Sequence, residues 1–405
     1  MTGDGTWTAP GQAFWQKARR DTDWQSWAAP PRPGRGWRIF WRVVAVVVAV
    51  GLVAIFVASR WVVPYYAITP GTPLNVSQLI SVPAGEAHAH RGGVILTDVT
   101  YERLTALGYL TYHFDADAQI VSAAEFTGGA SSVAYEEEGV IDMWTAREAA
   151  VLVALRELGY HPRAVPVGVA VYATDPGAAS DSLLAVGDVV TAIGSTRTPL
   201  FGPLVAAVAS APPGSSIRVT YHEFGTTRSL VKSLVVGEVE RVGAGSAGAE
   251  TCVRAGSKVG KAVHRDGRLE RCLPFSGQQL YSDVNEPFRV TLAADGIGGP
   301  SAGLSFTLGL MEKLDAADLT GGLRVAATGT MANNGSVGAI GGISQKTIAV
   351  REAGANVFLV PPANAAVARA HAGPGLRIIA VDSIGQAVQA LERLGGRLVP
   401  ATATR

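Results

Sequence analysis

The sequence predicts an α+β protein that is tied to a membrane by one N-terminal helix and carries several folded domains beyond it. Two observations predict this fold class. A charge-free apolar run extends from Val43 to Ser59, and the chain after it mixes short strand-like runs with amphipathic helical segments. A length of 405 residues allows two or three domains with buried cores beyond the helix.

The apolar run is expected to form a single membrane-spanning helix over residues 43–63. As a helix it rises about 26 Å, so Trp61 and the two valines after it are expected to complete a hydrocarbon core of about 30 Å. Arginines are concentrated before the run. The positive-inside rule therefore places residues 1–42 in the cytoplasm as an irregular tail, and the chain after about Pro64 outside the cell membrane. A cleaved signal peptide is the alternative, but its charged N-terminal region would be unusually long.

Composition narrows the expected partners and cofactors. The formal net charge is +1 and charged residues make up 17% of the chain, so no nucleic-acid partner is expected. The two cysteines, Cys252 and Cys272, both follow the apolar run, where an oxidising compartment would let them pair; two unpaired thiols are the alternative. His88 and His90 have no further ligand at metal-binding spacing, so neither a metal nor another cofactor is expected.

Beyond the membrane the chain is predicted to hold three regions. Residues 64–164 are expected to form an α/β region that ends with a helix capped at Gly159. In residues 165–238, the run DPGAASDSLLAVGDVVTAIGS and the later PGSSIRVTYHEFG resemble a PDZ domain. That resemblance implies a groove that binds an extended peptide by strand addition, with the carboxylate-binding loop at about Val165–Val169. This segment lacks the Gly-Leu-Gly-Phe pattern.

Residues 239–400 carry two motifs that resemble the Lon peptidase domain: GIGGPSAGLSFTLGLMEKL at 296–314 and ATGTMANNGSVGAIGGISQKTIAVREAGANVFLVP at 327–361. The resemblance implies that Ser301 in the first motif is the nucleophile and that Lys346 in the second is the general base. It also implies that Thr328 hydrogen-bonds the lysine ammonium; a threonine paired across a sheet is the alternative. The residues expected to support the oxyanion are Gly299, Pro300 and Ala302.

The residue types in these motifs suit that chemistry. A Gly-Gly-Pro turn before a helical pattern places Ser301 at a helix N-terminus, where free N–H groups can stabilise an oxyanion. A serine hydroxyl needs a base, and a lysine serves only when its pKa falls toward neutrality. Ser344 is expected to cap a helix with Lys346 in its first turn, where the helix dipole and apolar neighbours such as Ile348 disfavour the charged amine.

Several other features of the sequence bear on the expected site and on nucleotide binding. Gly298 stands where Lon peptidases often have an acidic residue, and Asp295 is the nearest carboxylate. His371 is an alternative base without a surrounding motif. The glycines in 243–248 spell GxGxxG but precede no periodic helix, and 256–261 imitates a P-loop without its first glycine. No ATPase module is expected.

The sequence therefore predicts a membrane-anchored, ATP-independent serine endopeptidase with a Ser-Lys dyad. Its expected substrates are extracytoplasmic peptides or unfolded protein segments, bound or admitted by the PDZ-like domain. The alternatives are a catalytically silent PDZ scaffold and an acyl hydrolase for non-peptide esters. Because Lon-type domains often form rings, the resemblance also implies a possible homo-oligomer.

Overall fold

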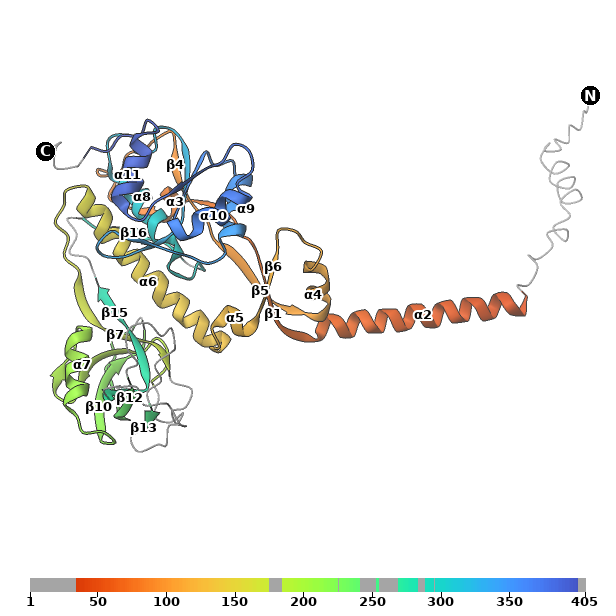
Figure 1. Cartoon of the computed structure of the whole chain (residues 1–405), viewed down its shortest axis with the longest axis horizontal. Helices are drawn as coiled ribbons and strands as arrows, with labels where there is room; N and C mark the ends of the chain where they lie inside the picture. Colours follow the sequence, from red (N-terminus) through yellow and green to blue (C-terminus); the bar gives the residue numbers. More distant parts are fainter. Residues whose placement is uncertain are drawn as a thin grey trace, which may run out of the picture. The chain divides into compact units, whose positions relative to one another are not determined.

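The computed structural model of the chain describes residues 34–174, 184–224, 226–240, 253–254, 269–282, 288–294 and 296–399. It contains mixed helix and strand and divides into two compact units. One unit holds the N-terminal helix with residues 105–107, and the other holds the remaining folded chain. Figure 1 gives the order of the elements along the chain.

Helix α2 (Arg35–Arg60) is long and apolar enough to cross a membrane, and none of its residues is buried by other parts of the protein. Its 26 residues rise about 39 Å, more than a hydrocarbon core of about 30 Å. The predicted end of the helix at residue 63 is wrong, because the helix stops at Arg60 and Trp61 has extended backbone. Pro64 disfavours helical backbone at the residue before it, so the chain enters strand β1 (Val62–Pro70) instead.

The segment that carries Ser301 and Lys346 is built around a five-stranded sheet with the order β2-β4-β17-β20-β21. Four of these strands are parallel, and β2 pairs antiparallel with β4. Parallel strands are usually covered on both faces, and here alternate residues enter two separate clusters. The strands are β2 (Leu74–Asn75), β4 (Gly93–Leu96), β17 (Arg324–Ala327), β20 (Val357–Val360) and β21 (Arg377–Ala380).

Helices cover both faces of this sheet. Apolar residues of α6, α8 and α11 pack with Leu96, Val325 and Leu359 on one face. Those of α9 and α10 pack with Ile95 and Phe358 on the other. The helices are α6 (Ser132–Glu157), α8 (Gly303–Leu314), α9 (Ile343–Glu352), α10 (Ala365–His371) and α11 (Ile384–Glu392).

Residues 64–164, expected to form a region of their own, share this sheet and core with the C-terminal segment. Strand β4 lies beside β17, and helix α6 belongs to the same apolar cluster as α8. Figure 1 shows β4, in orange, among the blue elements of the C-terminal half. The physical reason is burial, because Val94, Ile95 and Leu96 are all buried and need cover on both faces of the sheet.

A second sheet follows the order β11-β10-β8-β7-β15, with β9 paired to β8 and helix α7 packed on its core. Its last strand, β15, lies outside the predicted range 165–238. The expected carboxylate-binding loop at Val165–Val169 is wrong, because these residues begin strand β7 and pair with β15. The resemblance to a PDZ domain stays a prediction. The elements are β7 (Val165–Thr174), β8 (Val189–Ile193), β9 (Thr196–Arg197), α7 (Phe201–Ser210), β10 (Ser216–His222), β11 (Leu230–Val235) and β15 (Phe275–Ser282).

The remaining strands form smaller sheets, with the orders β5-β1-β6, β13-β12-β14, β16-β3 and β18-β19. Cys272, at the end of β14, is disulfide-bonded, and its predicted partner Cys252 lies outside the described residues. The strands are β3 (Ile80–Ser81), β5 (Val99–Thr105), β6 (Gln119–Ser122), β12 (Gly237–Glu240), β13 (Val253–Arg254), β14 (Leu269–Cys272), β16 (Thr291–Leu292), β18 (Thr330–Met331) and β19 (Val337–Gly338). The helices and turns are α3 (Val76–Leu79), α4 (Ala106–Tyr112), α5 (Ala123–Thr127), η3 (Pro300–Ala302) and η4 (Pro362–Asn364).

Candidate active site

Ser301 lies in a tight turn immediately before helix α8. Gly299 has a φ of +83°, which favours glycine, and Pro300 begins the turn η3. The carbonyl of Ser301 accepts a hydrogen bond from Gly329 N at 2.9 Å. A Cβ on Gly303 would lie 2.7 Å from Met331 N, so only glycine permits this close approach. The turn is therefore held against the loop that follows β17.

Lys346 lies in the first turn of helix α9, as expected. The N-cap of this helix is Gly342, with a φ of +65°, two residues before the predicted cap. Ser344 is therefore already inside the helix. The Ser344 hydroxyl contacts Gln345 Oε1 instead of capping the helix. The side chain of Lys346 is only 3% exposed, so its amine is held away from water.

The structure brings Ser301 and Lys346 together. Lys346 Nζ lies 2.5 Å from Ser301 Oγ, within hydrogen-bond distance. Ser301 is carried by the turn before α8 and Lys346 by α9, two segments that the parallel sheet places side by side. This is the distance required between a nucleophile and its general base.

Burial lowers the pKa of Lys346 from its ordinary 10.5 to about 8, because the charged amine loses its water. A negative carboxylate nearby, Asp98, opposes part of that shift. At pH 7 about one lysine in ten is then neutral, against about one in three thousand at a pKa of 10.5. The neutral amine is the form that can accept a proton from Ser301.

Asp98 is a residue of this site that sequence reasoning missed. It follows strand β4, and its atom Oδ1 is buried without a hydrogen-bond partner among the described residues. Burial raises the pKa of this carboxyl, and the charge of Lys346 lowers it. Gly71 makes room for it, since a Cβ there would overlap Asp98 Oδ1. Asp98 reaches the site because β4, which is distant in sequence, pairs with β17 in the five-stranded sheet.

The predicted supporting residues surround Ser301, but Thr328 and Gly299 make other hydrogen bonds than those expected. The Thr328 hydroxyl donates a hydrogen bond to the carbonyl oxygen of Ser301 at 3.2 Å rather than accepting one from the Lys346 ammonium. The Gly299 N–H donates to Gly139 O of α6 at 2.9 Å, and proline has no N–H. The oxyanion donors that the motif still offers are therefore the amides of Ser301 and Ala302.

Ser301 and Lys346 both line a cavity of about 1060 Å³. Its wall includes the Gly298–Ala302 loop, the start of α9, Asp98 and one face of α6. A volume of this order suits several residues of an extended chain or a small molecule of drug size. The dyad is thus reachable from outside while the amine itself stays buried.

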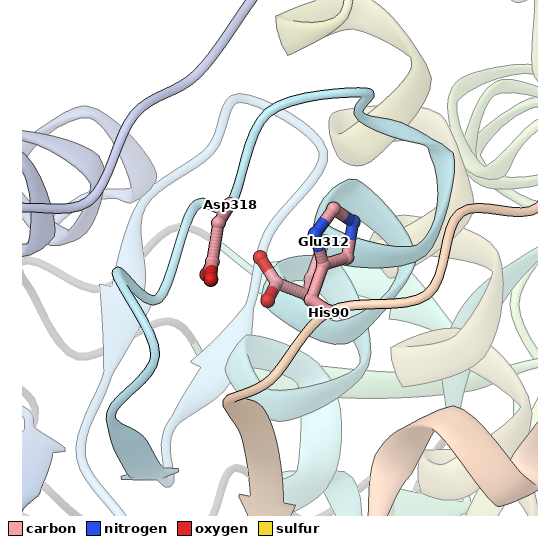
Figure 2. Close-up of side chains that lie close together, drawn as sticks. All are labelled: His90, Glu312 and Asp318. Carbon is pink, nitrogen blue, oxygen red and sulfur yellow. The ribbon is translucent and has the colours of Figure 1, made fainter.

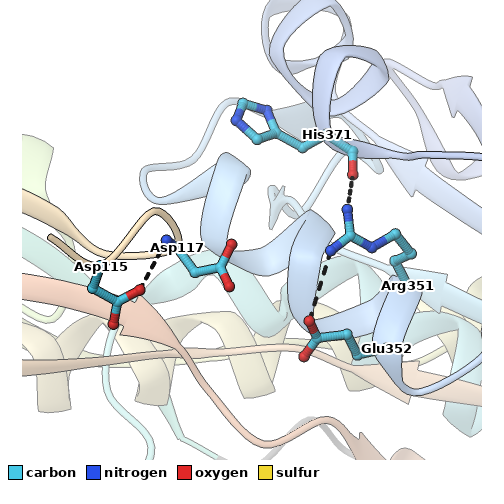
Figure 3. Close-up of polar contacts among 5 residues, drawn as sticks. All are labelled: Asp115, Asp117, Arg351, Glu352 and His371. Carbon is cyan, nitrogen blue, oxygen red and sulfur yellow. Dashed lines mark hydrogen bonds and ion pairs between the residues drawn. The ribbon is translucent and has the colours of Figure 1, made fainter.

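His371, the alternative base, lies at the end of α10. Its Nδ1 is 2.9 Å from Val367 O, and its carbonyl accepts a hydrogen bond from Arg351, which also contacts Glu352 (Figure 3). It is not among the described residues that line the cavity with Ser301. Its geometry gives it no access to the nucleophile.

The neighbourhood of His90 differs from the expectation. No metal partner was expected for this histidine, but the fold brings it near Glu312 and Asp318, with ligand atoms within 4.8 Å of one another (Figure 2). The Glu312 carboxylate accepts hydrogen bonds from Thr320, and His90 Nε2 contacts Asp315 O. These contacts fasten the end of α8 to its following loop. Sequence spacing could not reveal them, because His90 precedes Glu312 by more than half the chain.

Three of the sequence features named above lie outside the described residues. They are Asp295 and the glycine-rich runs 243–248 and 256–261.

The comparison with known families assigns the segment that carries the dyad. Residues 285–391 match the Lon protease (S16) C-terminal proteolytic domain. The match includes Ser301 and Lys346 and supports a serine peptidase activity. No curated protein matches the chain. Asp98 and the whole of α6 lie outside the matched residues.

Proposed function

We propose that the protein is a membrane-anchored serine endopeptidase that hydrolyses peptide bonds with a Ser301–Lys346 dyad and without ATP. The observation that carries the proposal is the contact of 2.5 Å between Lys346 Nζ and Ser301 Oγ, made by a lysine whose burial brings its pKa to about 8. The match of residues 285–391 to a Lon-type proteolytic domain supports the same reaction class.

In the proposed reaction, neutral Lys346 accepts the proton of Ser301 as Oγ attacks the carbonyl carbon of the scissile peptide bond. The tetrahedral intermediate places its negative oxygen near the amides of Ser301 and Ala302. Lys346, now an ammonium, donates its proton to the leaving amine, and an ester between Ser301 and the substrate remains. Water then attacks this ester with Lys346 again as the base, releasing the acid product and restoring the serine.

Asp98 has a positioning role in this proposal. Its carboxylate favours the ammonium form of Lys346, which is the form that the neutral lysine becomes when it accepts the serine proton. It therefore stabilises the charge that develops during the reaction, while it also keeps the resting pKa from falling further. Asp98 thus helps Lys346 to accept the serine proton but reduces the fraction of neutral lysine at rest.

The remaining parts of the proposal concern location and substrate. The arginine-rich flank of α2 favours a cytoplasmic N-terminus and an extracytoplasmic dyad. The sequence has no complete nucleotide-binding motif, which favours accessible peptides and unfolded segments over stably folded proteins. The PDZ-like region is proposed to bind such segments or to regulate their access.

The test is cleavage of a fluorescently labelled unfolded protein by the full chain in lipid nanodiscs, with and without ATP. Cleavage without ATP that is lost in both Ser301→Ala and Lys346→Ala supports the proposal. Ser344→Ala, which removes a hydroxyl beside the lysine but outside the dyad, should keep activity. No cleavage by the wild-type chain across several substrates and pH values would favour a binding scaffold, and cleavage that survives Lys346→Ala would reject the dyad.

A further inference from the structure

The cavity that contains Ser301 has an acidic wall. Among its described lining residues, the ionisable cations are Arg147 and the catalytic lysine. The carboxylates outnumber them and come from three separate segments: the residues after β4, helix α5 and helix α6. They are Asp98, Glu125, Glu136, Glu138 and Asp142. None of these carboxylates forms an ion pair with another residue in the described part of the chain.

Two of the carboxylates lie on the helix that contacts the loop of Ser301. Glu138 and Asp142 are four residues apart on α6 and therefore lie on the same side of the helix. Between them, Gly139 O accepts the hydrogen bond from Gly299 N at 2.9 Å. The backbones approach closely here, since a Cβ built on Gly139 would be in van der Waals contact with Gly299 N, at 3.6 Å. The acidic pair is thus fixed to the loop that presents Ser301.

In the described part of the chain, neither Glu138 nor Asp142 forms an ion pair. Burial raises the pKa of Glu138, and the charge of Asp142 raises it further. The pKa of Asp142 is also raised by burial, although Tyr172 donates a hydrogen bond to its Oδ2 at 3.0 Å. Carboxylates held close together in a partly buried site favour the approach of an external cation.

Aromatic rings line the same cavity and also favour a cationic side chain. Phe126 and Tyr135 have ring centroids 4.8 Å apart, and Trp144 and Phe224 have centroids 5.5 Å apart. Aromatic faces hold the aliphatic stem of lysine or arginine and attract its charged head. A wall of carboxylates and rings therefore suits a long cationic side chain better than a short polar or an acidic one.

We propose that this acidic wall selects substrates that carry a lysine or arginine close to the scissile bond, with Glu138 and Asp142 as the residues that contact its charge. This inference rests on the proposed function and adds the chemical class of the substrate. It concerns residues outside the segment that matches the Lon-type domain, so it is a property of this chain's own α6.

The test measures kcat/KM for matched peptides with the full chain in nanodiscs. The peptides have one sequence and differ at a single position near the scissile bond, which holds lysine, glutamine or glutamate. At low ionic strength the lysine peptide should be cleaved about tenfold faster than the glutamine peptide and the glutamate peptide more slowly still. The preference should shrink as salt is added.

Variants of α6 then locate the preference. Glu138→Gln and Asp142→Asn should each reduce the ratio of lysine-peptide to glutamine-peptide cleavage by about threefold or more, and Glu138→Lys should reverse it toward glutamate. Glu137→Gln is the matched control, because Glu137 is exposed on the same helix and lies outside the cavity. The ratio within one variant is the readout, so a general loss of activity does not imitate the effect.

The outcomes separate the two proposals. Cleavage of none of the peptides, with an intact fold, counts against the peptidase itself. Cleavage of all three at equal rates, or a lysine preference that persists in both neutral variants, overturns the acidic-wall proposal and leaves the peptidase in place.

Discussion

Replacing Lys346 by methionine should stabilise the protein at neutral pH while it removes the proposed base. Methionine has nearly the same length and no charge, so it fills the pocket of a side chain that is 3% exposed. The change of the lysine pKa from 10.5 to about 8 corresponds to about 3 kcal/mol of unfavourable free energy in the folded state at pH 7. Loss of the contact with Ser301 subtracts about 1 kcal/mol from this gain.

The stability advantage of Lys346→Met should depend on pH between about 8 and 10.5. Between about pH 8 and 10.5 the unfolded lysine is still protonated while the folded one is neutral, so the unfolded state binds more protons. The wild-type free energy of unfolding therefore rises with pH across this window. The advantage of the methionine variant should be full below pH 8 and should disappear by about pH 10.5.

The assay compares urea midpoints of wild type and Lys346→Met in detergent from pH 6 to 11, with equal m-values as the condition for comparison. Lys313→Met is the matched control. Its amine donates to Ser77 O and Ile80 O, so its loss should destabilise the protein by about 1–3 kcal/mol. A Lys346→Met variant that is less stable than wild type at pH 7, or a difference that does not vary with pH, would refute the reasoning.

Two further substitutions test the surroundings of the dyad. Asp98→Asn removes the charge that raises the pKa of Lys346, so the acid limb of the kcat/KM profile should move to lower pH; an unmoved limb, or one at higher pH, would contradict its role. Gly303→Ala places a Cβ 2.7 Å from Met331 N and should cost about 1–3 kcal/mol. Its melting temperature and its cleavage rate should both fall, since the turn of Ser301 shifts, and wild-type values would contradict the packing argument.

The two dyad positions could be predicted from the sequence because each lies within a local motif. The glycines and proline before Ser301 define its turn, and the segment around Lys346 has an apolar helical pattern. Helix α9 starts two residues before the predicted position because Gly342 adopts left-handed backbone as its cap, whereas a side-chain cap at Ser344 is the more usual signal. The apolar pattern alone continues to residue 63, whereas helix α2 ends at Arg60 because Pro64 disfavours helical backbone at the residue before it.

The other parts of the site depend on pairing between distant segments. Asp98 reaches Lys346 only because β4 joins β17 in a parallel register, and no local pattern announces such a pairing. The acidic face of α6 meets the nucleophile loop through the contact of Gly139 with Gly299. Long-range packing of this kind depends on which residues become buried together, and a local sequence pattern does not show that.

The pH dependence of kcat/KM for the full chain tests the central claim most directly, because it reports the protonation state of the free enzyme's base. If neutral Lys346 takes the proton of Ser301, cleavage of a neutral peptide should rise with pH along a single limb with an apparent pKa of about 8. A limb near 6.5, the ordinary value for histidine, or a rate that is independent of pH between 6 and 9 would contradict it.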